Sequence, residues 1–144
     1  MLDKFVAGTV ARPLYLFGDT GTGKTLGALA LCDIIETAAY WEADRFSSFV
    51  MYRSDELDSE LHRLSEKELL VIDEIGTRTK ATDLGCGALK MLLDVREQNG
   101  GATIIIGNIR PEEIEGLYDA RIASRVLCGS IFELNGEDRR EAGR

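Results

Sequence analysis

Residues 18–25 read GDTGTGKT and directly follow a short apolar run, Leu14 to Phe17. The segment matches the pattern Gly-x4-Gly-Lys-Ser/Thr, in which glycines let the backbone wrap around a phosphate chain and present its N–H groups. Lys24 supplies a positive charge for the β and γ phosphates, and the Thr25 hydroxyl stands where Mg²⁺ would sit. We therefore predict a nucleotide-binding loop between a strand and a helix. Its residues are Gly18, Asp19, Thr20, Gly21, Thr22, Gly23, Lys24 and Thr25.

A second candidate is the stretch LLVIDEIG, residues 69–76, in which an apolar run ends in two carboxylates. Asp73, at the carboxyl end of a buried strand, would reach Mg²⁺ directly or through water. Glu74 would face the γ phosphate and polarise an attacking water. Taken alone, such a pair could simply close a strand, but together with the phosphate loop it predicts hydrolysis of ATP.

Three more side chains stand out in the sequence. Asn108 follows the apolar run ATIIIG, and strands beside a phosphate loop deliver the residues at their carboxyl ends to the same crevice. Asn108 could therefore orient the attacking water, although an Asn after Gly is also a common turn residue. Arg121 and Arg125 lie four residues apart, on one face of a predicted helix, and are far along the chain from the phosphate loop.

The elements that must position these residues alternate between apolar runs and helical patterns, which predicts a parallel sheet with crossover helices. The continuously apolar runs LLVID and TIIIG are typical of central strands covered on both faces. The predicted strands are Leu14–Phe17, Ser48–Tyr52, Leu69–Asp73, Thr103–Gly107 and Ser130–Leu134. The predicted helices span about Lys24–Tyr40, Asp55–Leu64, Asp83–Gln98 and Pro111–Leu127.

The composition indicates one globular domain. Of the 144 residues, 44% are hydrophobic and 29% are charged, and a chain of this length has room for one core. We expect a single domain over residues 1–144, with residues 1–12 as a leader and residues 136–144 as a solvated tail. The three cysteines are widely spaced and there is a single histidine, so we expect buried thiols rather than disulfides or a zinc site.

The charge limits what the chain can bind. A net charge of −8 argues against tight binding of nucleic acid by the chain as a whole, because such binding rests on Lys and Arg that neutralise phosphates. Arg78 and Lys80, in the loop after Glu74, are the candidates for a local DNA contact, although solvated loop charges would look the same. The sequence has no evident membrane span or signal peptide, which favours a cytoplasmic location.

Together these motifs resemble the AAA+ ATPases and, within that superfamily, the DnaC/DnaI-type helicase loaders of bacteria and phages. The resemblance covers residues 14–140. The phosphate-loop motif is common to all P-loop NTPases, whereas the ending PEEIEGLYDARIASRVLCGSIFELNGEDRR is more selective. It is similar to the loaders' final helix, arginine pair, last strand and Asp-Arg-Arg. The IstB-type transposition helpers share the same core and are the nearest alternative.

The resemblance implies an α/β fold, a P-loop NTPase three-layer sandwich with a five-stranded parallel sheet ordered 5-1-4-3-2, as an AAA+ core without a lid domain. It implies ATP and Mg²⁺ as cofactors, with ATP at the interface of an ATP-dependent homo-oligomer in which Arg121 or Arg125 completes the neighbour's site. The family places a replicative hexameric helicase on single-stranded DNA. The loaders' amino-terminal helicase-binding region is missing before Gly18, and the segment from Arg53 to Glu68 is short. Helicase binding and DNA contact are therefore less directly implied than ATP binding.

Three functions stay open. The first is an assembly-dependent ATPase that acts on a helicase and holds single-stranded DNA weakly by itself. The second is a small-molecule P-loop kinase, which would need an acceptor pocket and a lid with arginines that the short connections do not plainly offer. The third is an ATP-switched adaptor without hydrolysis, which would lack Glu74 or the arginine pair, yet both are present.

Overall fold

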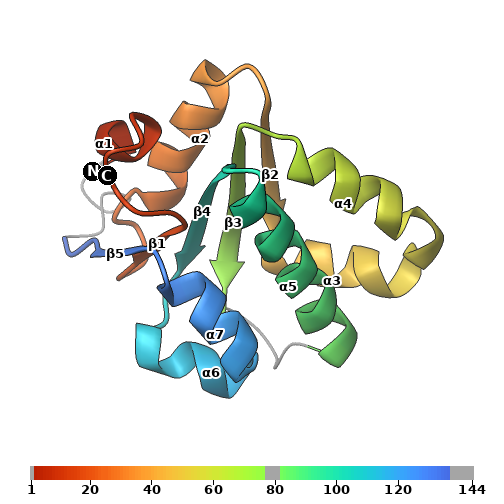
Figure 1. Cartoon of the computed structure of the whole chain (residues 1–144). Helices are drawn as coiled ribbons and strands as arrows, with labels where there is room; N and C mark the ends of the chain where they lie inside the picture. Colours follow the sequence, from red (N-terminus) through yellow and green to blue (C-terminus); the bar gives the residue numbers. More distant parts are fainter. Residues whose placement is uncertain (1, 77–81, 137–144) are drawn as a thin grey trace, which may run out of the picture.

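The computed structural model describes residues 2–76 and 82–136. Its sheet has five strands, all parallel, in the order β2-β3-β4-β1-β5, which is the predicted order read from the other edge (Figure 1). The strands are β1 (Leu14–Phe17), β2 (Ala38–Glu42), β3 (Leu69–Ile75), β4 (Ala102–Gly107) and β5 (Ser130–Glu133). The helices are α1 (Leu2–Val6), α2 (Lys24–Ile34), α3 (Ala43–Tyr52), α4 (Leu57–Ser65), α5 (Asp83–Gln98), α6 (Ile114–Leu117) and α7 (Ala120–Leu127), with 3-10 turns at Ser54–Glu56 and Pro111–Glu113.

Helices cover both faces of the sheet, which gives three layers (Figure 1). Helices α1 and α2 pack on one face, where Phe5 is fully buried, and helices α3 to α7 pack on the other. Successive side chains of a strand point to opposite faces. In β3, Val71 therefore joins the core under α2, while Leu70 and Ile72 join the core under α3 to α7. Burial on both sides explains why this strand is continuously apolar.

The second strand does not lie where the sequence analysis put it. The predicted helix over Lys24–Tyr40 ends at Ile34, and the predicted strand over Ser48–Tyr52 is part of α3. The true β2 pairs in register with β3 along its whole length. In α3, the buried residues Phe46 and Val50 are four positions apart. This spacing of about one helical turn indicates a helix rather than a strand.

The predicted helix over Pro111–Leu127 is also interrupted. The break falls at Tyr118, whose φ of −113° and ψ of −105° are not helical. Asp119 then caps the start of α7, and its carboxylate accepts a hydrogen bond of 2.8 Å from the backbone N–H of Ile122. Such an N-cap satisfies an otherwise unpaired donor of the first turn, and it sets α7 in a new direction, packed against α5. By contrast, β1 and α5 have the predicted bounds.

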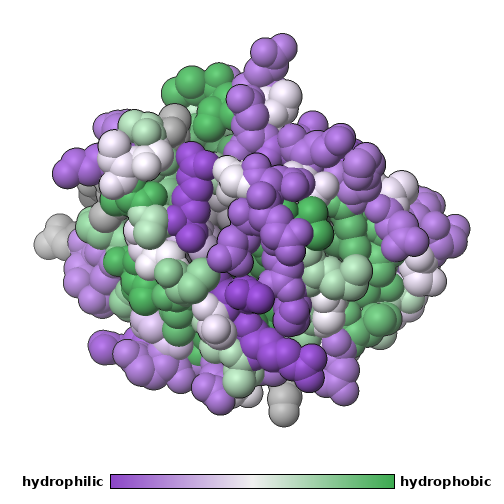
Figure 2. Space-filling model, viewed as in Figure 1, coloured by the Kyte–Doolittle hydropathy of each residue, from purple (hydrophilic) through white to green (hydrophobic). Residues whose placement is uncertain are grey.

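Helix α2 is apolar on both sides. Ala28 and Leu31 are buried against the sheet, whereas Leu26, Leu29 and Ile34 are 73%, 38% and 78% exposed. Figure 2 shows hydrophobic surface over the end of α2 that is farthest from the phosphate loop, whereas the centre of the view is broadly hydrophilic. Helix α2 therefore carries exposed apolar side chains on its outer face in addition to those buried against the sheet.

Each helix in the described part of the chain is too short or too polar to cross a membrane. The cysteines are free, and Cys86 is buried and Cys32 half-buried, but Cys128 is exposed. The prediction of buried thiols is wrong for Cys128 because it caps the end of α7, where the chain turns at the surface toward β5.

A buried guanidinium ties the helices to the sheet at the end where the strands begin. Arg96 of α5 is 1% exposed, and burial lowers the pKa of Arg96 to about 10, so it stays charged at neutral pH. Its N–H groups donate to Thr103 Oγ1 at 2.9 Å and to the carbonyl oxygens of Leu64, Lys67 and Ala102 at 2.5, 2.9 and 2.6 Å. One side chain thus pairs backbone acceptors that would otherwise be buried without donors.

Arg96→Lys should lower the free energy of unfolding by roughly 2–4 kcal/mol, because one ammonium cannot span these acceptors and each unpaired buried carbonyl costs about 1–3 kcal/mol. Denaturant titration followed by circular dichroism measures the change. The control is Arg63→Lys, at an exposed arginine of α4 that pairs with Glu60, where a change below about 0.5 kcal/mol is expected. Equal stability of the two variants would contradict the assignment of Arg96 as a structural clamp.

Candidate nucleotide-binding site

The predicted phosphate loop lies where β1 ends and α2 begins, at the carboxyl ends of the strands. Gly18, Gly21 and Gly23 have φ angles of +128°, +80° and +91°, which favour glycine. Gly18 also has no room for a side chain, since a Cβ there would lie 2.1 Å from the carbonyl oxygen of Leu134. Strand, loop and helix follow one another as the sequence predicted.

The ammonium of Lys24 is folded into the loop. Lys24 is 7% exposed, and Nζ donates to the carbonyl oxygens of Gly18 and Asp19 at 2.7 and 2.6 Å and to Thr22 Oγ1 at 3.2 Å. Burial lowers the pKa of Lys24, while the carboxylates of Asp19 and Asp73 act in the opposite direction. All three acceptors are neutral, and hydrogen bonds from an ammonium to an anionic oxygen are stronger. Phosphate oxygens could therefore replace them.

Asp73 connects the loop to the sheet. It is 2% exposed, and its Oδ2 accepts hydrogen bonds from the hydroxyls of Thr25 at 2.7 Å and Tyr40 at 2.9 Å, while Oδ1 accepts one of 2.7 Å from the backbone N–H of Glu74. Burial, then the hydrogen bond to Asp73, raises the pKa of Tyr40 far above its usual value, so its phenol remains a donor. Three donors compensate this buried carboxylate.

Sequence reasoning missed Tyr40 because it placed this residue at the end of a helix. The available signal was the run AAYWE, residues 38–42, which contains two aromatic residues that favour strands. It lies between the end of α2 and the helical pattern of α3, and it is as long as an ordinary strand. Assigning it to a strand would have put Tyr40 next to the strand that carries Asp73.

A β-bulge near the end of β3 lets the neighbouring residues Asp73 and Glu74 reach the same cleft. The register between β3 and β4 shifts between Ile72 and Ile75, and Glu74 has a φ of +60°, a conformation that costs a non-glycine residue about 1–2 kcal/mol. In a regular strand the two neighbours would point to opposite faces of the sheet. With the bulge, Asp73 is buried and Glu74 is exposed, yet both line the same cleft.

This cleft gathers most of the predicted site residues. It has a volume of about 680 Å³ and is lined by residues 20–25 of the loop together with Asp73, Glu74 and Asn108. Asn108 directly follows β4 and is exposed. The cleft therefore joins a cation, two carboxylates and an amide at the carboxyl edge of the parallel sheet, where ligands of such folds bind.

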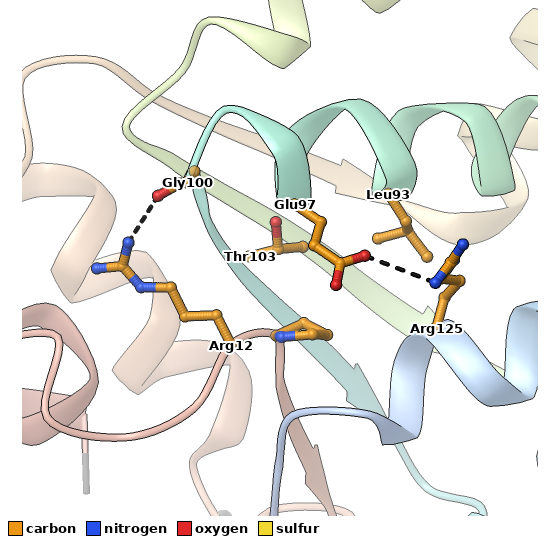
Figure 3. A pocket seen from close by; sticks show the side chains of 8 residues that line it. Arg12, Leu93, Glu97, Gly100, Thr103 and Arg125 are labelled. Atoms are coloured by element: carbon orange, nitrogen blue, oxygen red, sulfur yellow. Dashed lines mark hydrogen bonds and ion pairs between the residues drawn. The ribbon is translucent and has the colours of Figure 1, made fainter.

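The two arginines of α7 are not among the residues that line this cleft. Arg125 forms ion pairs with α5, and its Nε lies 2.5 Å from Asp94 Oδ1. Its Nη1 lies 3.6 Å from Glu97 Oε2 (Figure 3). The first contact is an ion pair rather than an aligned hydrogen bond. Arg121 is exposed and has no hydrogen bond or ion pair within residues 2–76 and 82–136. Sequence spacing made the two arginines look equivalent, and the fold distinguishes them.

The donor set fits Mg²⁺. The Thr25 hydroxyl and the Asp73 carboxylate are hard oxygen donors that already touch each other. Mg²⁺ is usually held by one or two protein oxygens, substrate phosphates and water rather than by a cage of side chains. The described residues include no group of three or more His, Cys, Asp and Glu side chains that could hold a metal ion. The candidate DNA contacts Arg78 and Lys80 lie outside the described residues.

Comparison with known proteins finds structural neighbours, while no family model and no curated protein sequence matches the chain. The AMPPCP-bound DnaA of Aquifex aeolicus superimposes with a TM-score of 0.78 at 17% identity, over 97% of this chain and 46% of DnaA. A DnaI structure gives 0.75 at 20% identity, over 96% of this chain and 80% of DnaI. A candidate primosome component from Streptococcus pyogenes serotype M3 gives 0.72 at 26% identity, over 96% and 78%.

The chain thus spans less than half the length of this DnaA but most of DnaI. Similarity at these identities defines the fold, and it agrees with the strand order of the sheet. The predicted resemblance is confirmed at this level: the chain has the AAA+ P-loop fold of DnaA and of the DnaC/DnaI-type helicase loaders.

Proposed function

We propose that this protein is an ATPase that binds Mg²⁺ and ATP in the cleft between the phosphate loop and β3 and acts as a helicase loader in DNA replication initiation. The observation that carries ATP binding is the meeting of Lys24, Thr25 and Asp73 at one cleft beside the glycine-rich loop. DnaA, a structural neighbour, holds the ATP analogue AMPPCP, which supports the same class of ligand for this chain.

The adenine base has a suitable place next to the phosphate loop. A cavity of about 340 Å³ shares Gly23, Lys24 and Leu134 with the cleft, and its other lining residues are Leu2, Asp3, Leu16 and Phe132. Binding sites for flat organic groups are usually apolar with few polar contacts, and this lining has that character. A nucleotide would thereby extend from this cavity, with its base, into the loop, with its phosphates.

Each polar residue has a task that follows from its position. Lys24 would exchange the loop carbonyls for oxygens of the β and γ phosphates, and the N-terminal end of α2 would add its N–H groups. Mg²⁺, held by Thr25 and Asp73, would neutralise charge on the phosphates. Glu74, at the wall of the cleft, would accept a proton from the attacking water, and Asn108 would hold that water in place.

Hydrolysis is proposed to need a second copy of the chain. The cleft of one chain contains Lys24 as its buried cation, whereas Arg121 is exposed on α7 and not part of the lining. An arginine from a neighbour stabilises charge on the transferring phosphoryl group. The apolar outer face of α2 lies beside the cleft, since Leu26 and Ala30 line it, and this face supports an ATP-dependent homo-oligomer.

The role in replication rests on the neighbours. DnaI, DnaC and the primosome component each match more than four fifths of this chain. They favour a replicative hexameric helicase as the partner, with single-stranded DNA as the substrate on which it is placed, and the cytoplasm as the compartment. A DnaA structure with bound single-stranded DNA also matches. With a net charge of −8, this chain alone should hold such DNA weakly.

Two alternatives predict different assays. An IstB-like transposition helper would share every step of ATP hydrolysis but would respond to a transposase instead of a helicase. A small-molecule P-loop kinase would transfer phosphate to an acceptor and release little phosphate without one. Phosphate release measured with a replicative helicase, single-stranded DNA or small acceptors therefore separates the proposals.

Lys24→Ala should weaken binding of ATP by roughly 10- to 100-fold, because a hydrogen bond to a charged group contributes about 1.5–3 kcal/mol. Calorimetry with Mg²⁺ and ATP measures the affinity. The control is Lys67→Ala, just before β3 at the opposite end of the sheet, which should bind like the wild type. The proposal fails if Lys24→Ala binds ATP as tightly as the control does.

Glu74→Gln should bind ATP nearly normally but lose hydrolysis by roughly 10²- to 10⁴-fold, because the amide keeps the shape and cannot accept the proton. Phosphate release at saturating ATP measures the rate. Glu112→Gln, at an exposed carboxylate in the 3-10 turn, is the control and should hydrolyse normally. Normal turnover by Glu74→Gln would mean that another group activates the water.

Arg121→Ala should bind ATP yet hydrolyse it roughly 10³-fold more slowly or worse, as expected for an arginine supplied by a neighbour. Mixing it with Lys24→Ala should restore part of the activity, because some interfaces then pair an intact cleft with an intact Arg121. Wild-type activity should rise more than linearly with protein concentration.

The matched variant is Arg125→Ala, which loses the ion pairs with Asp94 and Glu97. It should hydrolyse ATP faster than Arg121→Ala. Recovery in the Arg125→Ala mixture alone would reassign the role to Arg125. Recovery in neither mixture, while wild-type chains assemble and turn over ATP, would rule out an arginine supplied in trans.

A further inference from the structure

Tyr40 is the one side chain from β2 that hydrogen-bonds to the candidate magnesium ligand Asp73. Its Cα lies opposite Val71, two residues before the pairing of Glu42 with Asp73, so the side chain reaches along the sheet to the carboxylate. The ring is half-buried against the apolar cluster under α2. A ring with two rotatable bonds that is fixed by packing presents its hydroxyl at a defined point.

The Asp73 carboxylate is oriented from three elements. Thr25 approaches from the start of α2, Tyr40 from β2, and the Glu74 N–H from the bulge of β3 itself. A hydroxyl that donates its hydrogen to a carboxylate keeps its lone pairs for another partner, so Thr25 can hold Asp73 and still serve as a ligand. Tyr40 is not among the residues that line the cleft, and its contact with the nucleotide site passes through Asp73.

We propose that Tyr40 is a positioning residue for Mg²⁺: its hydroxyl holds Oδ2 of Asp73 in the orientation that the ion requires. The inference rests on the proposed function as an Mg²⁺-dependent ATPase. Mg²⁺ demands nearly ideal octahedral geometry and tolerates a turned ligand poorly. Mutation of a group that hydrogen-bonds to a metal ligand typically lowers metal affinity or activity by about 10- to 100-fold.

The test compares Tyr40→Phe with wild type and with Tyr52→Phe, at an exposed tyrosine of α3. Binding of a non-hydrolysable ATP analogue is measured by calorimetry in EDTA and over a series of Mg²⁺ concentrations. Tyr40→Phe should need roughly 10-fold more Mg²⁺ for half of the magnesium effect, while its affinity in EDTA stays that of the wild type. Tyr52→Phe should match the wild type in both conditions.

A second variant separates the hydroxyl from the packing of the ring. Tyr40→4-aminophenylalanine restores a donor at the same end of the ring, so it should return the Mg²⁺ requirement most of the way to the wild-type value. The proposal is overturned if Tyr40→Phe shows the wild-type Mg²⁺ dependence, if the amino variant does not recover it, or if affinity in EDTA falls as much as affinity in Mg²⁺.

These outcomes are distinct from failure of the proposed function. If wild-type binding does not respond to Mg²⁺ and Lys24→Ala binds as tightly as wild type, the nucleotide site itself is wrong, and the assignment of Tyr40 falls with it. If wild type and Lys24→Ala behave as expected while Tyr40→Phe is indistinguishable from wild type, the role of Tyr40 alone is refuted.

Discussion

The compensation of one buried carboxylate, Asp73, constrains most of the structure around the site. An ionised carboxylate without partners inside a protein is very unfavourable, and Asp73 is 2% exposed. Its donors come from the start of α2, from β2 and from the bulge of β3. The register of β2 on β3, the position of the phosphate loop and the path of the chain after Asp73 must all be right at once. The same geometry that stabilises the fold therefore presents hard oxygens to the nucleotide cleft.

The bulge that directs Glu74 into the cleft depends on a neighbouring glycine. After the register shift, Ile75 pairs with Gly107 of β4, and a Cβ at Gly107 would lie 2.7 Å from Ile75 Cγ2 and 2.9 Å from the Ile75 carbonyl oxygen. A side chain at that position would push the strands apart. Because Asn108 directly follows Gly107, the feature that makes room for the bulge also brings the amide to the cleft wall.

Local patterns predicted the parts of the fold that are determined locally. The phosphate loop and the apolar core of β3 follow from residue types within one short segment, and the sheet order followed from the family resemblance. What could not be predicted depends on long-range contacts. The run around Tyr40 has a local strand signal, but the pairing with β3 that brings its hydroxyl to Asp73 is a long-range contact. Arg125 is engaged by Asp94 and Glu97, about thirty residues earlier in the chain. No spacing rule within α7 could reveal those partners.

The break before α7 links the two halves of the proposed chemistry. Tyr118 stands at this break, and its phenol oxygen accepts a hydrogen bond of 3.2 Å from the backbone N–H of Gly76, two residues after Glu74. Arg121 follows on the first turn of α7, which Asp119 caps. The carboxylate proposed to act in a chain's own cleft and the arginine proposed for the neighbour's cleft are thus joined through one short connection. Because this hydrogen bond spans from the break to the end of β3, it helps to fix where α7 begins relative to the strand that carries Glu74.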